Sequence, residues 1–410
     1  MDVNGDASRL QWSLKLLLFG MLLLHSFGCA SDDRANTAES LVIWHAYEEG
    51  GDEHLFLKES LARFRAINPE TEVRAVAVPF EPFANKIRVS VPRGNGPDLF
   101  LFAHDQLGDW ASKNLIEPIG LWADAEQLAP IQPSALDAFL YKDQLYGLPI
   151  VAKTLGLYYH RDVVSEPIET TDELANAVVG LKQQHPDLVG FAYDVDDLFF
   201  HAPWLLGSGG GLLKDEQFTF DQRPYIAGFV ASLELVKGWV KKGVVLPDAS
   251  YDRVKDKFKR GKVAYVLSGP WFATGLKEGS YGVTTLPRIG DKTGPRARPL
   301  MSVEGIYMNR FSRQKKRAIK LMRFLASKKE AEHRKRATNQ IVTRTDTSPT
   351  TDPVLAAFES QLSWATPTPN SSKMKALWTP LNRVLAEVIV RDKDPNEAIN
   401  EARRLLERGE

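Results

Sequence analysis

The stretch GPDLFLFAHD at residues 96–105 carries the clearest structural signal in the chain. Its run Asp98–Phe102 predicts a buried strand, and a helix is predicted to begin near Asp105, after the short loop Ala103–His104. In open α/β sheets, ligands bind where the end of a strand faces the start of a helix. This segment therefore predicts a ligand site within an α/β fold.

The residues before this stretch show the same alternation of strand and helix. Leu41–Trp44 predicts the first strand, helical spacing follows through Leu57, Leu61 and Phe64, and Val73–Val78 predicts a strand covered on both faces. Short apolar runs that alternate with amphipathic stretches are typical of βαβ units. We therefore expect sheets that are mostly parallel and flanked by helices.

A second α/β set follows, and the chain then returns to the first. The second set predicts strands at Gly156–Tyr159, Gly190–Tyr193 and Val263–Leu267 and a helix at Tyr225–Lys242; the return predicts a strand at Gly305–Met308, a helix at Lys315–Ser327 and two closing helices. With 410 residues, the chain is long enough for two lobes that need no disulfide or metal to be stable.

Charge and hydrophobicity exclude several classes of protein. Lys+Arg and Asp+Glu both number 52, which argues against a nucleic-acid binder or a polybasic membrane-surface protein and favours a neutral ligand. The apolar run Leu16–Leu24 is too short to span a bilayer.

The N-terminus instead has the layout of a secretory signal. Arg9 and Lys15 precede the apolar run, and small residues surround Cys29, the only cysteine. We predict a signal peptide at residues 1–28, lipidation of Cys29 as in bacterial lipoproteins, and a flexible tether at residues 29–40. The predicted location is the outer side of a membrane in the cell envelope. Plain secretion with an incidental cysteine is the alternative.

Several segments, in this order, resemble the bacterial extracellular solute-binding proteins of the maltose-binding type. They are Leu41–Trp44, Gly96–Asp105, Tyr146–Pro149, Leu157–Asp162, Phe258–Ala264, Ser268–Trp271, Tyr281–Val283 and Leu286–Pro287. The resemblance covers about residues 41–408. It implies two lobes, one from residues 41–149 and 304–352 and the other from residues 150–303 and 353–410.

The same resemblance implies a function without catalysis. A di- or oligosaccharide would bind in the cleft, the hinge would close, and the closed form would deliver the sugar to an ABC permease. It implies a monomer that needs no cofactor or metal and binds no nucleic acid. We therefore expect no enzymatic activity.

Three aromatic residues are candidate plates for the apolar faces of sugar rings. Trp271 follows Gly269-Pro270 at a strand end, where a turn should project it into the cleft rather than the core. Phe102 and Trp378 match aromatic ligand contacts of the family, but each also fits a core position.

Four charged residues are candidate contacts for sugar hydroxyls. Asp105 fits a ligand contact or a helix cap, and Glu48 and Asp197 match acidic contacts of the family but also fit solvated loops. Lys153 stands where the maltose-binding pattern has a glutamate. We expect it to pair with an acid such as Asp105, to bind an acceptor group of the ligand, or to remain solvated.

Three other functions remain open at this point. A glycoside hydrolase would also combine aromatic residues with carboxylates, although no carboxylate pair stands in a recognisable catalytic setting. A ferric-ion receptor could use Tyr158-Tyr159, but no histidine and carboxylate set completes such a site. A protein that senses or presents a sugar without transporting it cannot be separated from a transport receptor by sequence.

Overall fold

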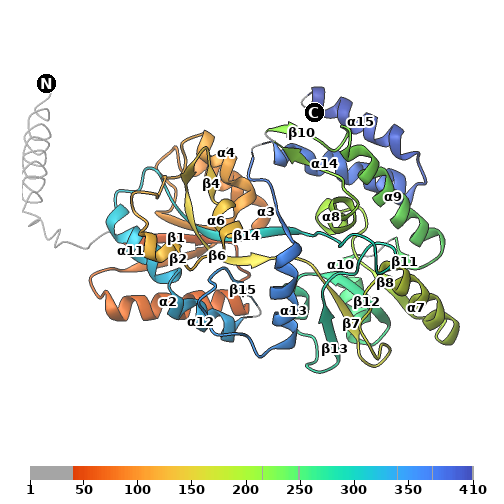
Figure 1. The fold of residues 1–410 in the computed structure, drawn as a ribbon. Coiled ribbons are helices and arrows are strands. Elements are labelled where there is room, and N and C mark those ends of the chain that lie inside the picture. Colours follow the sequence, from red (N-terminus) through yellow and green to blue (C-terminus); the bar gives the residue numbers. More distant parts are fainter. Residues whose placement is uncertain (1–39, 215, 248–249, 339, 372, 409–410) are drawn as a thin grey trace, which may run out of the picture. The chain divides into compact units, whose positions relative to one another are not determined.

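Two β-sheets flanked by helices organise the chain (Figure 1). The computed structural model describes residues 40–214, 216–247, 250–338, 340–371 and 373–408. The predicted signal peptide, Cys29 and nearly all of the predicted tether lie outside these residues. Among the helices that the model describes, none is both long and apolar enough to cross a bilayer.

The first sheet has seven strands in the order β15-β6-β14-β3-β1-β2, with β16 paired to β14. The strands are β1 (Leu41–His45), β2 (Val73–Ala77), β3 (Leu99–Ala103), β6 (Gly147–Lys153), β14 (Leu300–Met308), β15 (Ile341–Val342) and β16 (Thr366–Pro367). Its helices are α2 (Asp52–Ile67), α3 (Phe80–Ser90), α4 (Leu107–Ser112), α5 (Ala125–Leu128), α6 (Pro133–Asp137), α11 (Lys315–Leu325) and α12 (Lys328–Ala337).

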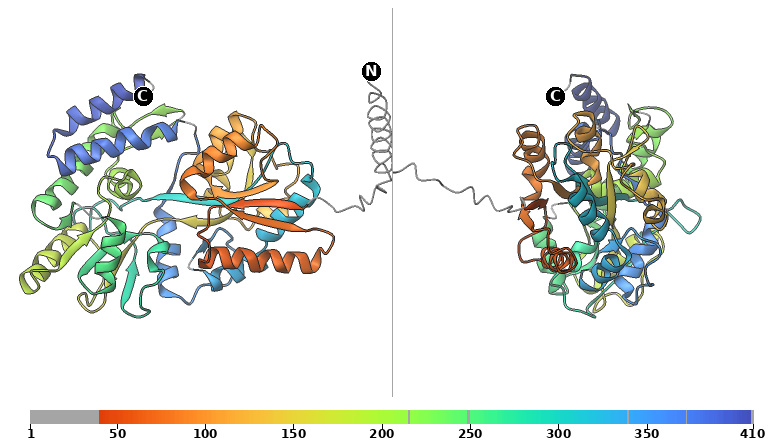
Figure 2. Two further views of the ribbon diagram at one scale, coloured as in Figure 1. Left: turned by 180° about the vertical axis from the view of Figure 1, so that it is seen from behind. Right: turned by 90° about the vertical axis from the view of Figure 1, so that its left-hand side faces the viewer.

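The second sheet has five strands in the order β11-β8-β12-β7-β13. The strands are β7 (Gly156–His160), β8 (Val189–Ala192), β11 (Val245–Leu246), β12 (Val263–Ser268) and β13 (Tyr281–Thr284). Its helices are α7 (Thr171–Gln184), α8 (Leu198–Gly207), α9 (Tyr225–Lys241), α10 (Tyr251–Lys259), α13 (Pro353–Gln361), α14 (Met374–Leu385) and α15 (Pro395–Arg408). In Figure 2, as in Figure 1, α13 lies between the helices of the two sheets.

The α/β prediction is confirmed, but both sheets are mixed rather than mostly parallel. In the first sheet, β1 is parallel to β2 and β3, whereas β14 is antiparallel to β3 and β6. In the second, β12 is parallel to β8 and antiparallel to β7. β14 runs against both of its neighbours β3 and β6, β7 runs against both of its neighbours β12 and β13, and each of these two strands lies next to a chain passage between the sheets.

The prediction that the second strand is covered on both faces is wrong. This strand, β2, is the edge of the first sheet, and only Val73 in it is buried. A run of apolar and small residues therefore does not distinguish an edge strand from a central one.

The buried side chains form two packed cores, the first of which includes residues of both sheets. In the first, the ring of Phe100 stacks on Tyr307 at 5.1 Å, and Trp110 meets both rings edge-on. In the second, Trp204 and Trp239 pack edge to face at 5.2 Å. Aromatic pairs of this kind add about 1 kcal/mol each to the free energy gained by burial.

The chain passes between the sheets near residues 154–155, 285–299 and 343–352, and it returns briefly to the first sheet at β16, between α13 and α14. The predicted lobe boundaries at residues 149 and 303 fall inside β6 and β14, which pair along their lengths within the first sheet. The imidazole of His104 connects two separate segments here. Its Nδ1 accepts from Val303 N–H at 2.9 Å, and its Nε2 donates to the carbonyl oxygen of Thr368 at 2.7 Å.

Candidate functional site

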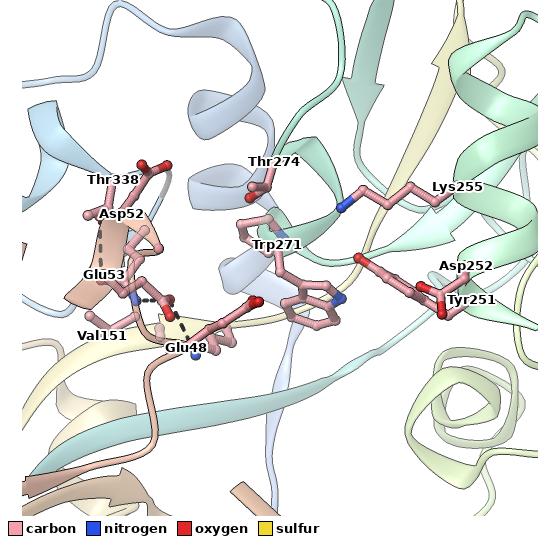
Figure 3. Close-up of a pocket in the computed structure, with 15 residues that line it drawn as sticks. Glu48, Asp52, Glu53, Val151, Tyr251, Asp252, Lys255, Trp271, Thr274 and Thr338 are labelled. Carbon is pink, nitrogen blue, oxygen red and sulfur yellow. Dashed lines mark hydrogen bonds and ion pairs between the residues drawn. The ribbon is translucent and has the colours of Figure 1, made fainter. Parts of the chain in front are cut away.

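A pocket of about 400 Å³ is lined by segments of both sheets (Figure 3). From the first come the loop after β1, the start of α2 and the end of β6; from the second come α10 and the 3-10 helix η2 (Pro270–Ala273). Its lining residues are Glu48, Gly51, Asp52, Glu53, Val151, Ala152, Lys153, Tyr251, Asp252, Lys255, Pro270, Trp271, Thr274, Thr338 and Gln340. Ligand pockets typically enclose about 300–1,000 Å³, so this one suits a small solute.

Trp271 provides an aromatic wall of the pocket, as the sequence predicts. The buried strand β12 ends at Ser268, and Pro270 begins η2, which turns the half-buried indole away from the sheet. A Cβ atom at Gly269 would lie 2.0 Å from this indole, so only glycine lets the ring pack there. The ring of Phe199 lies 6.3 Å from that of Trp271.

Lys153 lies at the first-sheet side of the pocket and is held by two carboxylates. Its Nζ lies 3.5 Å from Oε2 of the buried Glu304 and 3.7 Å from Oε1 of Glu53. Burial opposes the charge, but the attraction of Glu304 and Glu53 outweighs it and raises the pKa of Lys153. Lys153 therefore pairs with acids, which is one of the sequence alternatives, but the acids are Glu304 and Glu53 and not Asp105.

The same carboxylates extend the network into the first lobe. Tyr47 donates its hydroxyl to Glu304, and burial followed by that carboxylate raises the pKa of Tyr47 well above its usual range. On the other side, Gln340 donates to Glu53 and accepts from the buried guanidinium of Arg334. Since two cations and two carboxylates alternate in this network, its formal charge is zero.

The opposite wall carries residues that the sequence did not single out. Tyr251 and Asp252 stand exposed at the start of α10, and Lys255 lies one turn further on. Burial, followed by the repulsion of Lys259, lowers the pKa of Lys255. No local signal distinguishes these residues from an ordinary amphipathic helix, since only the fold brings α10 opposite the start of α2.

The pocket thus combines aromatic faces with hydrogen-bonding groups of both kinds. Trp271 and Tyr251 offer flat apolar surfaces, four lining carboxylates accept hydrogen bonds and Lys153 and Lys255 donate them. Glu48, predicted as a ligand contact, is exposed on the first-sheet side of the pocket. This chemistry suits a polyhydroxylated, uncharged solute better than an ion or an apolar one.

Two predicted contacts have mainly local structural roles. Asp197 is the N-cap of α8, where its side chain accepts from the Phe199 N–H at 2.7 Å, and it does not line the pocket. Phe102 is buried between the rings of Phe80 and Phe83, at 4.9 and 4.6 Å. The exposed aromatic face at that place belongs to Phe80, which the sequence did not indicate.

Asp105 and Trp378 also lie away from the pocket lining, although their elements pack together. Asp105 is in the 3-10 helix η1 (His104–Gln106), where it caps no helix and accepts from Gln106 Nε2 at 2.9 Å. Trp378 is half-buried on α14 and packs against the second core. Their contact with a ligand stays a prediction.

The tyrosine pair considered as an iron site has a structural role. Tyr158 is fully buried and donates its hydroxyl to the Gly269 carbonyl oxygen at 2.9 Å, just before Trp271. Among the residues that the structure describes, no group of three or more histidine, cysteine and carboxylate side chains is placed to hold a metal ion.

The pocket lies between segments of two α/β sheets, and several chain passages connect these sheets. This arrangement is typical of two-lobed receptors that close on a small solute. The chain belongs to the bacterial extracellular solute-binding proteins, whose family model matches residues 59–357.

Relatives that are named for their ligands support this family assignment. The maltotriose-binding protein of Pyrococcus abyssi is 29% identical over 376 residues, which cover 88% of this chain and 79% of the relative. A maltooligosaccharide ABC transporter solute-binding lipoprotein of Streptococcus pneumoniae is 23% identical over 342 residues, 78% of each protein. A cyclo/maltodextrin-binding protein, whose crystal structure was determined in complex with maltotetraose, is 26% identical in sequence. The two structures match with a TM-score of 0.79 over 90% of this chain and 97% of that one.

Proposed function

We propose that the protein is the extracytoplasmic substrate-binding subunit of an ABC-type sugar uptake system. It binds a di- or oligosaccharide and delivers it to a membrane permease. The observation that carries the proposal is the pocket in which Trp271 and Tyr251 from the second sheet face Glu48 and Lys153 from the first. The names of the relatives support the same ligand class and the same type of transporter.

Each wall of the pocket has a distinct task in this proposal. The indole of Trp271 stacks on the apolar face of a sugar ring, and Glu48 and Asp252 accept hydrogen bonds from ring hydroxyls. Lys153 donates to Glu304 and forms an ion pair with Glu53, which leaves donor capacity for an acceptor oxygen of the ligand. A longer oligosaccharide would also reach Asp105 and Trp378.

Because the two walls belong to different sheets, a bound sugar stabilises the closed arrangement of the lobes. The passages between the sheets act as the hinge. The permease then recognises the closed form. Nothing in this cycle changes the sugar chemically, so we infer that the protein is not an enzyme.

We further propose that Cys29 is lipidated after removal of residues 1–28 and holds the protein at the outer side of a membrane. The pneumococcal relative is a lipoprotein, which supports this. The single cysteine of the chain follows its apolar N-terminal run Leu16–Leu24 after four residues.

A thermal-shift screen followed by calorimetry tests the binding function. Maltose, maltotriose, longer maltooligosaccharides, galactooligosaccharides and charged sugars are compared, and a ligand bound only by the folded state raises Tm. We expect a neutral oligosaccharide to give the largest shift and to be recovered unchanged. Release of shorter sugars would instead establish a hydrolase, and a panel without any shift would contradict sugar binding.

A further inference from the structure

One segment of the first lobe is strongly basic in a chain whose formal charge is zero. Residues 310–323 contain seven cations and no carboxylate. The cations are Arg310, Arg313, Lys315, Lys316, Arg317, Lys320 and Arg323. The proposed sugar site uses none of them.

The fold turns this charge outward along α11. The helix buries Ala318, Ile319, Leu321, Met322 and Leu325 toward the first sheet. Lys316 and Lys320 are exposed four residues apart, so they share one side of the helix, and the exposed Arg313 lies two residues before its first turn. We call these three residues the basic face.

The carboxylates near this segment pair mainly with its cations outside the basic face. Glu117 pairs with Arg310 and Lys315 at 2.9 and 3.0 Å, and Asp124 pairs with Arg323 at 3.1 Å. Within the basic face, and among the residues that the structure describes, only Lys320 has an ion pair with an acid, the exposed Glu70 at 3.8 Å. Such an exposed pair contributes at most about 1 kcal/mol, so it leaves this lysine available.

Two exposed apolar side chains flank the cations. Phe311, just before α11, is 56% exposed, and Leu121 is fully exposed. Leu121 lies beside the other end of the helix, because Arg323 donates to the carbonyl oxygen of the adjacent Trp122. Cations beside isolated apolar side chains are typical of surfaces that lie in a membrane interface, where the apolar groups enter the headgroup layer.

The first described residues of the chain lie close to the segment that leads into α11, because Asp98 contacts both. Oδ2 of Asp98 accepts from Val42 N–H at 2.9 Å, and its Oδ1 accepts from Ser312 Oγ at 2.6 Å. Cys29 precedes Ser40 by eleven residues, which span at most about 40 Å even when fully extended. A membrane holding Cys29 is therefore within reach of α11.

We infer that the basic face, with Phe311 and Leu121, docks on the anionic lipid headgroups of the membrane that holds the protein. This contact orients the first lobe on the bilayer and limits how far the receptor moves on its tether. The inference rests in part on the proposed lipid anchor. Anionic phosphates complement the three exposed cations, and each cation near such a surface favours binding by about five-fold.

Fluorescence at the basic face tests the contact without the anchor. In full-length Cys29→Ser protein, Leu121→Cys introduces a single thiol for an environment-sensitive dye. Vesicles of phosphatidylcholine and phosphatidylglycerol in equal amounts should shift its emission to the blue, whereas pure phosphatidylcholine should not. A dye at Val390→Cys, exposed beyond α14, controls for general adsorption.

Charge variants identify the residues responsible. Replacing Arg313, Lys316 and Lys320 together by Gln should weaken vesicle binding at least 10-fold, given about five-fold per charge. The matched control replaces the exposed Lys242, Lys262 and Lys277 of the second lobe and should bind as before. Equal binding to neutral vesicles, equal loss in both variants, or an equal shift at Val390→Cys would overturn the inference. Sugar-induced thermal shifts, measured separately, show that each variant is folded and report on the proposed function independently.

Discussion

Acid pH should destabilise the protein through His201, a fully buried residue of α8. Ser232 Oγ donates to the Phe229 carbonyl oxygen, so it accepts the proton of His201 Nε2 at 3.0 Å. Nδ1 of the same ring is buried without a partner among the described atoms. Burial lowers the pKa of His201 from 6.5 to about 3.

The size of the effect follows from proton linkage. Below pH 6.5 the unfolded chain binds a proton on this imidazole, whereas the folded protein does so only near pH 3. The stabilisation is therefore complete above pH 6.5 and is lost progressively as the pH falls. Each pKa unit corresponds to ~1.4 kcal/mol, so the loss amounts to about 2 kcal/mol at pH 5 and about 3 kcal/mol at pH 4.

His201→Gln removes the titration but keeps an N–H donor for Ser232. Urea unfolding, followed by tryptophan fluorescence, gives the free energy of unfolding between pH 7 and pH 5. The variant should lose about 2 kcal/mol less over this range than the wild type, because all other titrating groups are shared. Parallel pH profiles for the wild type and His201→Gln would refute the reasoning.

Four further substitutions test the site and the anchor. Trp271→Ala should weaken sugar binding in calorimetry by about 2 kcal/mol, roughly 30-fold, with little change in Tm; unchanged affinity would remove Trp271 from the site. Gly269→Ala should displace the indole and weaken binding in the same assay, and wild-type affinity would show that the ring tolerates a Cβ. Lys153→Glu places a third carboxylate beside two others, so it should lower affinity by about 1 to 3 kcal/mol and change which sugar gives the largest thermal shift; an identical ligand profile would leave Lys153 without a binding role. Cys29→Ser should release the protein from the membrane fraction, and wild-type protein without lipid in mass spectrometry would disprove the anchor.

Periodicity was sufficient to predict the main elements of the fold. The predicted strand Leu41–Trp44 and helices Tyr225–Lys242 and Lys315–Ser327 agree within two residues with β1, α9 and α11. The position of Trp271 also followed from local chemistry, since a Gly-Pro pair after an apolar strand ends the strand and forces a turn.

The partners of individual side chains could not be predicted in this way. Glu304, the buried partner of Lys153, comes 151 residues later in the chain, and only the pairing of β14 with β6 brings the two together. Likewise, the strand around Phe102 contains no signal that Phe80 from α3 covers its ring. Asp197 fitted both a ligand contact and a loop charge, and its capping of α8 depends on where the helix begins.

The place of β14 in the first sheet also determines when that sheet can form during synthesis. β14 lies between β3 and β6, yet about 200 residues separate it from β3 along the chain. At typical elongation rates, roughly 10 to 40 s pass before the ribosome supplies this strand, and until then β3 and β6 lack the neighbour that joins them. The N-terminal half of the nascent chain therefore cannot complete its own sheet, which favours an unfolded, export-competent precursor if residues 1–28 act as the proposed signal peptide.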